Sequence, residues 1–544
     1  MALLETFGHP YLKSLAHRGY IQGTTLHSKA TNQPLCHYFG SVRYAHPPPE
    51  RWRRAQKLPE SYSYGTKDQP APCDKDAAVC PQPSFMGRPY TKGFTEDCFE
   101  ASVWVPLGEP PKEGWPVLFF IHGGWLQFGH PNGFSAAGLL GDAGLNAIVV
   151  LPAYRLNVFG FLYSSEIEKD ASSVGETAGN HGFWDQRLAL EWTRDNISLF
   201  GGNPSQITVS GYSAGAYSTF YQLAYDLQFP ASQAIIKQAC IWSNAAAVQP
   251  KSPASAQEQF DQLLSALHIP STLPWAEKIS HLRSLPFQTL LDAAMSVQLN
   301  QYRPTSDSAF IQPTLFKSLD SGAFARTLSA RNIRIMLGEC RDERHLYAAW
   351  FPPQADSLSA LHSRLLADYP RHVVDTLMKL HYPDGKLPSC CENWDNDAFG
   401  RVYAKMQVHD MQRGLIHALA SGGAGHLLYR YRIEWRAKCV DANIPPDWEV
   451  THSSDYPIWF WGNGHVLEPE EKGVIRRALI DPFIRFVHGE GDVKWGTTHH
   501  REMRTLKPDG SVEIVQDTAL WDEAMRVWKA LREVGEPEAS AAKL

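Results

Sequence analysis

Short apolar runs alternate along this chain with longer segments that contain no helix breaker. The runs are four to seven residues long, rich in β-branched and aromatic side chains, and typical of strands buried on both faces of a sheet. Segments 184–196 and 216–224 are predicted as helices between them. The predicted strands lie at 100–106, 117–121, 147–151, 207–210, 333–337 and 427–433. Strands and helices in alternation predict an α/β protein with a mostly parallel sheet.

Two helix-rich stretches, at about 250–330 and 358–420, interrupt this alternation, and an amphipathic helix is predicted at 521–534. A chain of 544 residues exceeds the usual size of one domain. Large α/β enzymes with insertions nevertheless reach this length around a single sheet. We therefore predict one domain over 1–544, with the two insertions forming a roof over a site.

The composition is that of a globular protein, with 43% hydrophobic and 20% charged residues. The 17 tryptophans favour a large core and an aromatic-lined pocket. A net charge of −6 gives no electrostatic basis for binding nucleic acid. Since no apolar stretch approaches about 18 residues, we expect no membrane span.

The cysteines and the termini bear on cellular location. Nine scattered cysteines are consistent with a reducing compartment, and none has the spacing of a metal site. The N-terminus lacks the basic and apolar regions of a secretory signal. The C-terminal Ala542-Lys543-Leu544 resembles the Ser-Lys-Leu peroxisomal address, which an import receptor would bind. We expect an intracellular protein, cytoplasmic or peroxisomal, that is not secreted.

The segment Gly211-Tyr212-Ser213-Ala214-Gly215 lies between a predicted strand and a predicted helix. A serine beside glycines is more often part of an ordinary turn. In a strand-turn-helix context, however, G-x-S-x-G is typical of a nucleophile elbow, where the tight turn requires small neighbours and exposes the serine oxygen. Ser213 is therefore the candidate nucleophile.

A second glycine-containing segment, 122–125, follows the strand predicted at 117–121. Its sequence, His-Gly-Gly-Trp, can be an ordinary turn, but its place upstream of the elbow matches the oxyanion loop of esterases. The predicted oxyanion donors are the backbone N–H groups of Gly124, Trp125 and Ala214.

A reactive serine also needs a base and an acid that orients the base. In α/β-hydrolases these follow the serine in the order acid, then histidine. Two carboxylates, Asp342 and Glu343, come after one predicted strand, and His452 comes after the next. The rival pair His499 and His500 lies in a polar stretch typical of a solvated loop.

A longer pattern surrounds these candidates. Its segments are GNHGFWDQRLALEW at 179–192, FGGNP at 200–204, GYSAG at 211–215, EDCF at 96–99 and YRLNVFGF at 154–161. Together they resemble the type-B carboxylesterases, the carboxylesterase/cholinesterase group of the α/β-hydrolase fold, over essentially the whole chain. The resemblance implies a mostly parallel sheet flanked by helices, with helical insertions that roof the active site.

The resemblance also assigns residues. The family's acid is usually the glutamate of a strand-end Asp-Glu-Gly, which selects Glu343 over Asp342, and the family's histidine matches His452. Ser243 stands where the family has a serine that supports the triad. Cys80 and Cys98 resemble the family's first disulfide pair, which we expect to be reduced in a protein that is not secreted.

Several positions depart from the family pattern. Trp125 replaces the third oxyanion glycine, so a bulky side chain must find room nearby. Arg344 and Ser453 replace the glycines that follow the acid and the base. Tyr212 stands where cholinesterases have a glutamate, and the segment that begins at Pro81 lacks their choline-binding tryptophan. Both losses remove cation-binding features, so poor turnover of choline esters is expected.

The predicted function is hydrolysis of a carboxylic ester through an acyl intermediate on Ser213, with His452 as base and Glu343 as its partner. No metal or organic cofactor is expected. The predicted substrate is a small-molecule ester with a bulky or apolar group. Two alternatives stay open at this point: an acyl transferase or lactone-forming enzyme that uses the same acyl-serine, and a non-catalytic binding protein on this fold.

Overall fold

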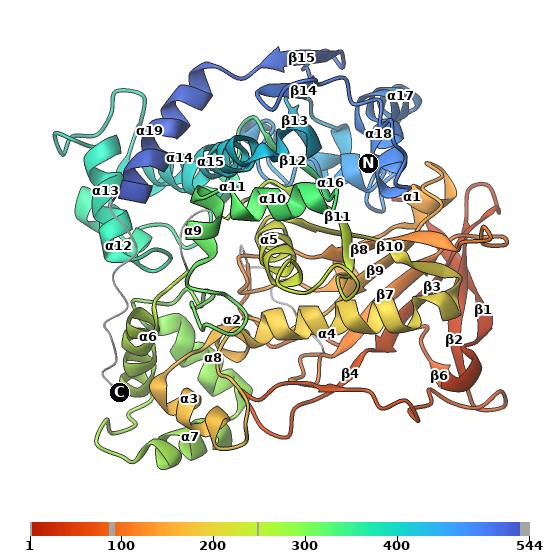
Figure 1. Ribbon diagram of the computed structural model, residues 1–544, viewed down its shortest axis with the longest axis horizontal. Coiled ribbons are helices and arrows are strands. Elements are labelled where there is room, and N and C mark those ends of the chain that lie inside the picture. Colours follow the sequence, from red (N-terminus) through yellow and green to blue (C-terminus); the bar gives the residue numbers. More distant parts are fainter. Residues whose placement is uncertain (1–2, 86–92, 247–249, 534–544) are drawn as a thin grey trace.

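The strands of the chain form one large mixed sheet, which crosses the molecule in Figure 1. The computed structural model describes residues 3–85, 93–246 and 250–533. Within these ranges thirteen strands belong to this sheet, and two short strands pair apart from it. The main path through the sheet is β1-β2-β3-β7-β9-β8-β10-β11-β12-β13-β14-β15, and β6 pairs with β2.

The sheet is antiparallel at its edges and parallel in its centre. The first strands are β1 (Thr6–Ser14), β2 (Tyr20–Ser28), β3 (Pro34–Arg43), β4 (Ala45–His46), β5 (Gln56–Lys57), β6 (Ala71–Pro72) and β7 (Glu100–Val105). The later ones are β8 (Trp115–Ile121), β9 (Ile148–Pro152), β10 (Gly202–Tyr212), β11 (Ile236–Trp242), β12 (Arg334–Cys340), β13 (Leu428–Ile433), β14 (Glu502–Leu506) and β15 (Val512–Gln516). Every neighbouring pair from β9 to β14 is parallel.

The central strands are mostly buried. All residues of β8 and of β9 are buried, because helices cover both faces of a parallel sheet. Helices α4 (His181–Asn196) and α5 (Ala214–Asp226) pack on the central strands, whereas α19 (Ala519–Glu533) packs on another helix, α15 (Asp410–Leu419). Helix α5 follows β10 directly and packs on β10 and β11. The carboxyl end of β10 and the start of α5 therefore meet inside the molecule.

Most of the remaining helices lie in two connections of the sheet. Those between β11 and β12 are α6 (Pro253–Ala266), α7 (Trp275–Ser284), α8 (Phe287–Ser296), α9 (Leu315–Asp320) and α10 (Ala323–Ala330). Those between β12 and β13 are α11 (Arg344–Ala348), α12 (Leu358–Leu366), α13 (Arg371–His381), α14 (Phe399–Ala404) and α15 (Asp410–Leu419). Helices α6, α7 and α8 lie apart, at the lower left of Figure 1, whereas α9 and α10 contact α15 of the second group. The organisation into one domain with two insertions stays a prediction.

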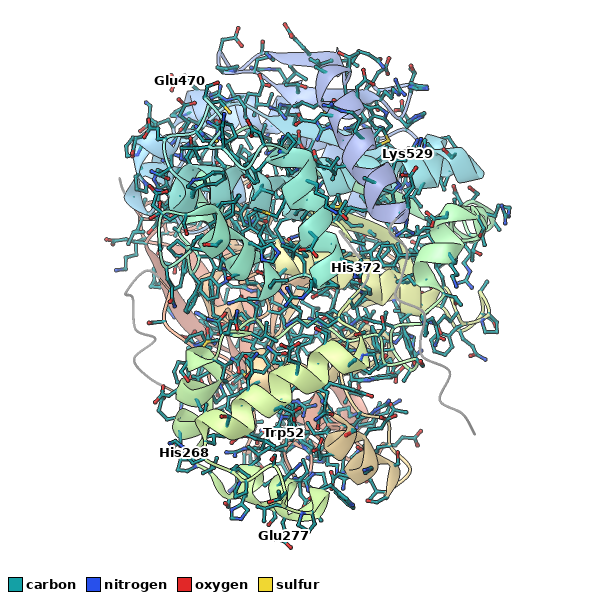
Figure 2. The ribbon with its side chains drawn as sticks, turned by 90° about the vertical axis from the view of Figure 1, so that its left-hand side faces the viewer. Trp52, His268, Glu277, His372, Glu470 and Lys529 are labelled. Carbon is teal, nitrogen blue, oxygen red and sulfur yellow. The ribbon has the colours of Figure 1, made fainter. Side chains whose placement is uncertain are left out.

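Tightly packed side chains fill the space between sheet and helices (Figure 2). The Nε1–H group of the buried Trp52 donates to the carbonyl of Val158 at 2.9 Å. Arg155 and Asp185 form a buried bidentate ion pair, with both contacts at 2.7 Å. An arginine paired in this way keeps its charge satisfied inside the core. His268, by contrast, lies exposed at the surface.

All six predicted strands are present, with small differences at their ends, and β10 is longer than predicted on both sides. The sequence pattern did not predict the edge strands β1 and β15, nor β14 beside β15. No residue of β1 or β15 is buried, and partly exposed residues alternate with buried ones in β14, so these strands lack the continuous apolar runs on which the prediction relied.

Two expectations lie wholly or partly outside the described residues. These are the C-terminal address at 542–544 and the part of the segment after Pro81 that falls within 86–92. No helix in the described part of the chain is both long and apolar enough to cross a membrane.

Candidate active site

Ser213 occupies a sharp turn between β10 and α5. Its φ of +56° lies in the left-handed region, which a serine rarely adopts unless the surrounding structure imposes it. The flanking glycines allow this turn: a Cβ on Gly211 would lie 2.1 Å from the carbonyl oxygen of Gly215, and one on Gly215 would lie 1.9 Å from that of Ile121. The N–H of Ser213 donates to the carbonyl of Trp242 at 2.9 Å. The turn thus has the geometry of a nucleophile elbow.

Glu343 and His452 meet in the interior, although 109 residues separate them. The Oε2 atom of Glu343 lies 2.5 Å from Nδ1 of His452, and its Oε1 atom accepts the N–H of Cys340 at 2.8 Å. Both side chains are almost fully buried. A buried carboxylate on Nδ1 leaves Nε2 to act as proton acceptor or donor. The structure therefore pairs Glu343, and not the neighbouring Asp342, with this histidine.

The loops that carry the acid and the base are tied to each other. The N–H of Asp342 donates to the carbonyl of Val450 at 2.9 Å, and the N–H of Leu346 donates to Oγ1 of Thr451 at 3.2 Å. These bonds are short cross-links between the end of β12 and the loop after β13. They hold Glu343 against His452 even though Arg344 and Ser453 replace the expected glycines.

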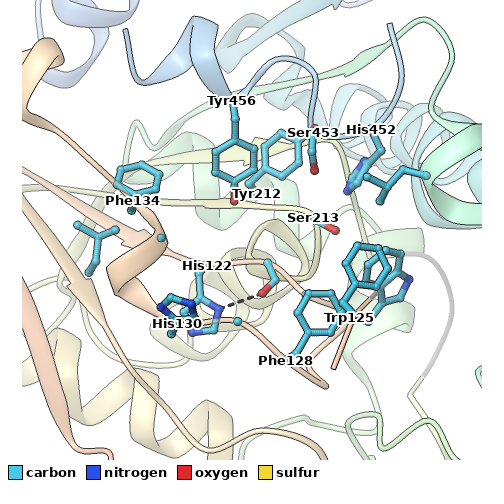
Figure 3. A pocket seen from close by; sticks show the side chains of 17 residues that line it. His122, Trp125, Phe128, His130, Phe134, Tyr212, Ser213, His452, Ser453 and Tyr456 are labelled. Atoms are coloured by element: carbon cyan, nitrogen blue, oxygen red, sulfur yellow. Dashed lines mark hydrogen bonds between the residues drawn. The ribbon is translucent and has the colours of Figure 1, made fainter. Parts of the chain in front are cut away.

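His452 and Ser213 line the same cavity (Figure 3). The Nε2 atom of His452 is buried and has no hydrogen-bond partner among the described residues. The ring of Tyr347 packs on the imidazole, with 4.5 Å between ring centroids. Burial and the neighbouring Glu343 raise the pKa of Tyr347 well above its usual value, while the Ser213 hydroxyl beside it opposes that shift.

The predicted oxyanion loop turns sharply beside Ser213. Gly124 and Trp125 have φ values of +109° and +54°, and the carbonyl of Gly124 accepts the N–H groups of Gln127 and Phe128. The N–H groups of Gly124 and Trp125, like that of Ala214 at the start of α5, donate to no acceptor within the described ranges. Three such unpaired donors beside a serine can hold a developing negative charge.

Arg303 holds this loop from the side of the helical insertion. Its Nη1 donates to the carbonyl of Trp125 at 3.0 Å, and its Nε donates to Oδ1 of Asp368 at 2.7 Å. Tyr403 donates to Oδ2 of the same carboxylate at 3.0 Å. Arg364 also pairs with Asp368, at 2.6 Å, and all three side chains are buried, so their charges depend on one another. The sequence offered no motif for this pair.

Tyr212 points away from Ser213 and toward the histidine loop. Its hydroxyl accepts the N–H of Ser453 at 2.8 Å and donates to Oδ1 of Asp455 at 2.5 Å. Asp455 also accepts Nε1–H of Trp459 at 3.1 Å. Burial raises the pKa of Asp455 to about 6, an effect that hydrogen bonding from Tyr212 opposes and the charge of Glu343 strengthens. The sequence analysis did not predict a role for Asp455, because an aspartate is usually exposed and no motif indicates that this one is buried beside Tyr212.

Ser243 follows β11 with a φ of +49°, and its N–H donates to the carbonyl of Gly338 at 2.9 Å. Its hydroxyl is buried and has no hydrogen-bond partner in the part of the chain that the structure describes. A supporting role for Ser243 in the triad therefore stays a prediction. The rival pair His499 and His500 is not among the residues that line the cavity.

The cavity measures about 220 Å³. Trp125 and Phe128 lie on one side of Ser213, and His122, His130 and Phe134 lie on the other (Figure 3). Burial lowers the pKa of His122 to about 3, so this imidazole is uncharged near neutral pH. Apolar aromatic walls with a few polar groups at the centre are typical of small-molecule sites.

The described residues contain no cluster of three or more histidine, cysteine or acidic side chains that could hold a metal ion. Cys80 and Cys98 are buried free thiols. Hydrogen bonding with the neighbouring Cys80 thiol, together with burial, raises the pKa of Cys98 well above its usual value. A thiol with a raised pKa is a poor nucleophile, and neither cysteine lines the cavity.

Comparison with known proteins identifies the family of the chain. The model of the carboxylesterase family matches residues 13–526. A carboxylic ester hydrolase of Gibberella moniliformis is 43% identical over 95% of this chain and 96% of its own length. An uncharacterised esterase/lipase of Schizosaccharomyces pombe is 37% identical over 94% and 95% of the two chains.

A solved structure supports the fold. EstA of Aspergillus niger superposes with a TM-score of 0.73 and covers 96% of this chain and 99% of its own, at 19% identity. The α/β-hydrolase fold and the family resemblance expected from the sequence are thereby confirmed. The chain belongs to the carboxylesterase family and is an enzyme of the carboxylic ester hydrolase class.

Proposed function

We propose that the enzyme cleaves esters through an acyl intermediate on Ser213. The observation that carries the proposal is the 2.5 Å contact between Glu343 and His452, which lines the same cavity as Ser213 and whose Nε2 has no partner among the described residues. A buried acid, an oriented imidazole and a serine on a strained turn are the groups that acyl transfer needs.

In the first half-reaction Nε2 of His452 takes the proton of the Ser213 hydroxyl as its oxygen attacks the ester carbonyl. Glu343 stabilises the imidazolium that forms. The negative oxygen of the tetrahedral intermediate accepts the N–H groups of Gly124, Trp125 and Ala214, at about 2.7–4 kcal/mol per donor. His452 then returns the proton to the departing alcohol, and the acyl group stays on the serine.

In the second half-reaction water takes the place of the alcohol. His452 removes a proton from the water as it attacks the acyl-serine, and the same N–H groups hold the second oxyanion. The carboxylic acid leaves and the serine regains its proton. Every proton that moves is held by His452, so the chemistry of these steps is complete with the residues of the chain.

The function is tested with short-chain p-nitrophenyl esters and a fluorophosphonate probe. The purified protein should hydrolyse the esters and become labelled on Ser213, as peptide mass mapping can locate. If it binds esters without turnover or labelling, the alternative of a non-catalytic binding protein is favoured. Transfer to an added alcohol is detected by product analysis, and dominant transfer products would favour the acyl-transferase alternative.

Two narrower expectations belong to the same proposal. Choline esters should be poor substrates, because Tyr212 directs its hydroxyl to Asp455 and presents no negative charge to the cavity. Rapid turnover of butyrylcholine would contradict this.

The peroxisomal address at 542–544 also stays a prediction. A reporter that carries these residues should concentrate in peroxisomes, and a diffuse cytosolic signal would contradict it.

A further inference from the structure

The indole of Trp125 forms one side of the cavity. It stacks on Trp350, with 4.9 Å between ring centroids and 17° between planes, and it meets the edge of Tyr347 at 5.7 Å. Phe85 and Phe128 also lie within 6 Å of it. We call Phe85, Trp125, Phe128 and Trp350 the aromatic wall. Because Tyr347 in turn packs on His452, the wall is continuous with the catalytic histidine.

Trp125 is held at this place against two local costs. Its φ of +54° is unfavourable for any residue with a side chain. Its Nε1–H group is buried and has no hydrogen-bond partner among the described residues. The turn of the oxyanion loop accounts for the φ, because it sets the direction of the backbone N–H. The buried, unpaired Nε1–H is the cost of an indole at this position, and the ring contacts with Trp350 and Tyr347 offset it.

The space beside the aromatic wall is small. The cavity of about 220 Å³ lies below the range of about 300–1,000 Å³ that is usual for pockets of drug-sized ligands. Trp125 and Trp350 are only 4% and 1% exposed, so an ester chain cannot pass between them without displacing an indole. The opposite side of Ser213, toward His122 and Phe134, is lined by separate residues.

We propose that Trp125 determines substrate specificity by closing the site on this side. The group of the ester that points past the oxyanion loop is then compact and apolar, as in acetyl to butyryl esters. The sequence predicted an ester with a bulky or apolar group. The structure adds that the group at the aromatic wall is apolar and short. The proposal rests on the ester hydrolysis proposed above, at the same serine.

The test compares two ester series in wild type and in Trp125→Gly and Trp125→Leu. One series lengthens the acyl chain of p-nitrophenyl esters from acetate to decanoate, and the other lengthens the alcohol of acetate esters. Glycine suits the positive φ, and leucine keeps part of the packing. Trp104→Leu is the matched control, because Trp104 is also buried, at 6% exposure, with an unpaired Nε1–H, and lies outside the cavity.

In wild type, kcat/KM should fall with chain length in one of the two series. In the Trp125 variants the ratio of kcat/KM for the longest and shortest esters of that series should rise about tenfold or more. The other series and Trp104→Leu should keep the wild-type profile. A ratio is used because a general loss of catalysis cancels in it.

Three results would overturn the inference. The first is a wild-type enzyme that prefers the long esters in both series, a result that needs no variant to fold. The second is an unchanged ratio in active Trp125 variants. The third is an equal rise in both series or in the Trp104 control, which would indicate general loosening. A folded wild type that hydrolyses no ester would instead contradict the proposed function itself.

Discussion

The hydroxyl of Tyr212 bridges the N–H of Ser453, from which it accepts at 2.8 Å, and the carboxylate of Asp455, to which it donates at 2.5 Å. Tyr212 directly precedes the nucleophile candidate Ser213, and Ser453 directly follows His452. This single hydroxyl therefore joins the elbow to the histidine loop. The glutamate expected at this position in cholinesterases could not make both bonds, because a carboxylate has no proton to donate.

Replacing Tyr212 with phenylalanine tests this bridge. Tyr212→Phe leaves the N–H of Ser453 and the carboxylate of Asp455 without their partner, so kcat should fall about tenfold and the free energy of unfolding by about 1–3 kcal/mol. The matched control is Tyr302→Phe, because the buried Tyr302 hydroxyl has no partner among the described residues. Steady-state kinetics and urea unfolding measure both effects. Equal behaviour of the two variants would contradict a positioning role for Tyr212.

The raised pKa of Asp455 predicts a pH-dependent contribution to stability. A folded-state pKa of about 6, above the unfolded value of about 3.9, means that the native state holds this proton more tightly. Wild-type stability is therefore favoured below about pH 4 and declines as the pH rises through about 6, by up to about 3 kcal/mol. Asp455→Asn lacks this titration. The stability difference between wild type and variant should shift by that amount, and a difference that stays constant with pH would contradict it.

Glu343 and Asp342 form a natural matched pair of carboxylates. Glu343→Gln removes the charge that stabilises protonated His452, so kcat should fall about 10³–10⁴-fold with little change in KM. Asp342 instead pairs with Arg341 and accepts the N–H of Val450 at 3.3 Å. Asp342→Asn should therefore retain kcat within a few fold. Similar losses in both variants would contradict the assignment of the acid.

Substitution of Arg303 should lower both the stability of the fold and kcat, and comparison with a variant of Asp368 distinguishes the two effects. Arg303→Met leaves Asp368 with Arg364 as its remaining cation, at 2.6 Å, so the free energy of unfolding should fall by about 1–3 kcal/mol. The carbonyl of Trp125 also loses its donor, and kcat should fall because the oxyanion loop is less well held. Asp368→Asn is the comparison, because it weakens the same ion pair but keeps Arg303 as donor to the carbonyl of Trp125, so it should lose less kcat than Arg303→Met. Equal losses of kcat in both variants would contradict the role in the loop.

The sequence predicted the parts of the fold and site that follow local rules. The central strands could be predicted because helices bury both of their faces, which gives continuous apolar runs in the sequence. Ser213 could be predicted because its sharp turn requires flanking glycines. His452 followed from its place after a strand, and the choice of Glu343 over Asp342 needed the family resemblance.

What the sequence could not predict depends on contacts between distant segments. Arg303 reaches the oxyanion loop from 178 residues away, and Tyr212 reaches Asp455 across 243 residues. Neither pair leaves a periodicity or a motif in the chain. The room for the Trp125 side chain likewise depends on Trp350, which belongs to the connection between β12 and β13.

The central claim is that Ser213 is the nucleophile, and the most direct measurement combines Ser213→Ala with fluorophosphonate labelling. The account predicts that wild type is labelled at Ser213 and hydrolyses short p-nitrophenyl esters. It predicts that folded Ser213→Ala is not labelled and loses about 10⁶-fold in kcat, as removal of a triad serine does in related chemistry. Full ester hydrolysis by folded Ser213→Ala would contradict the account.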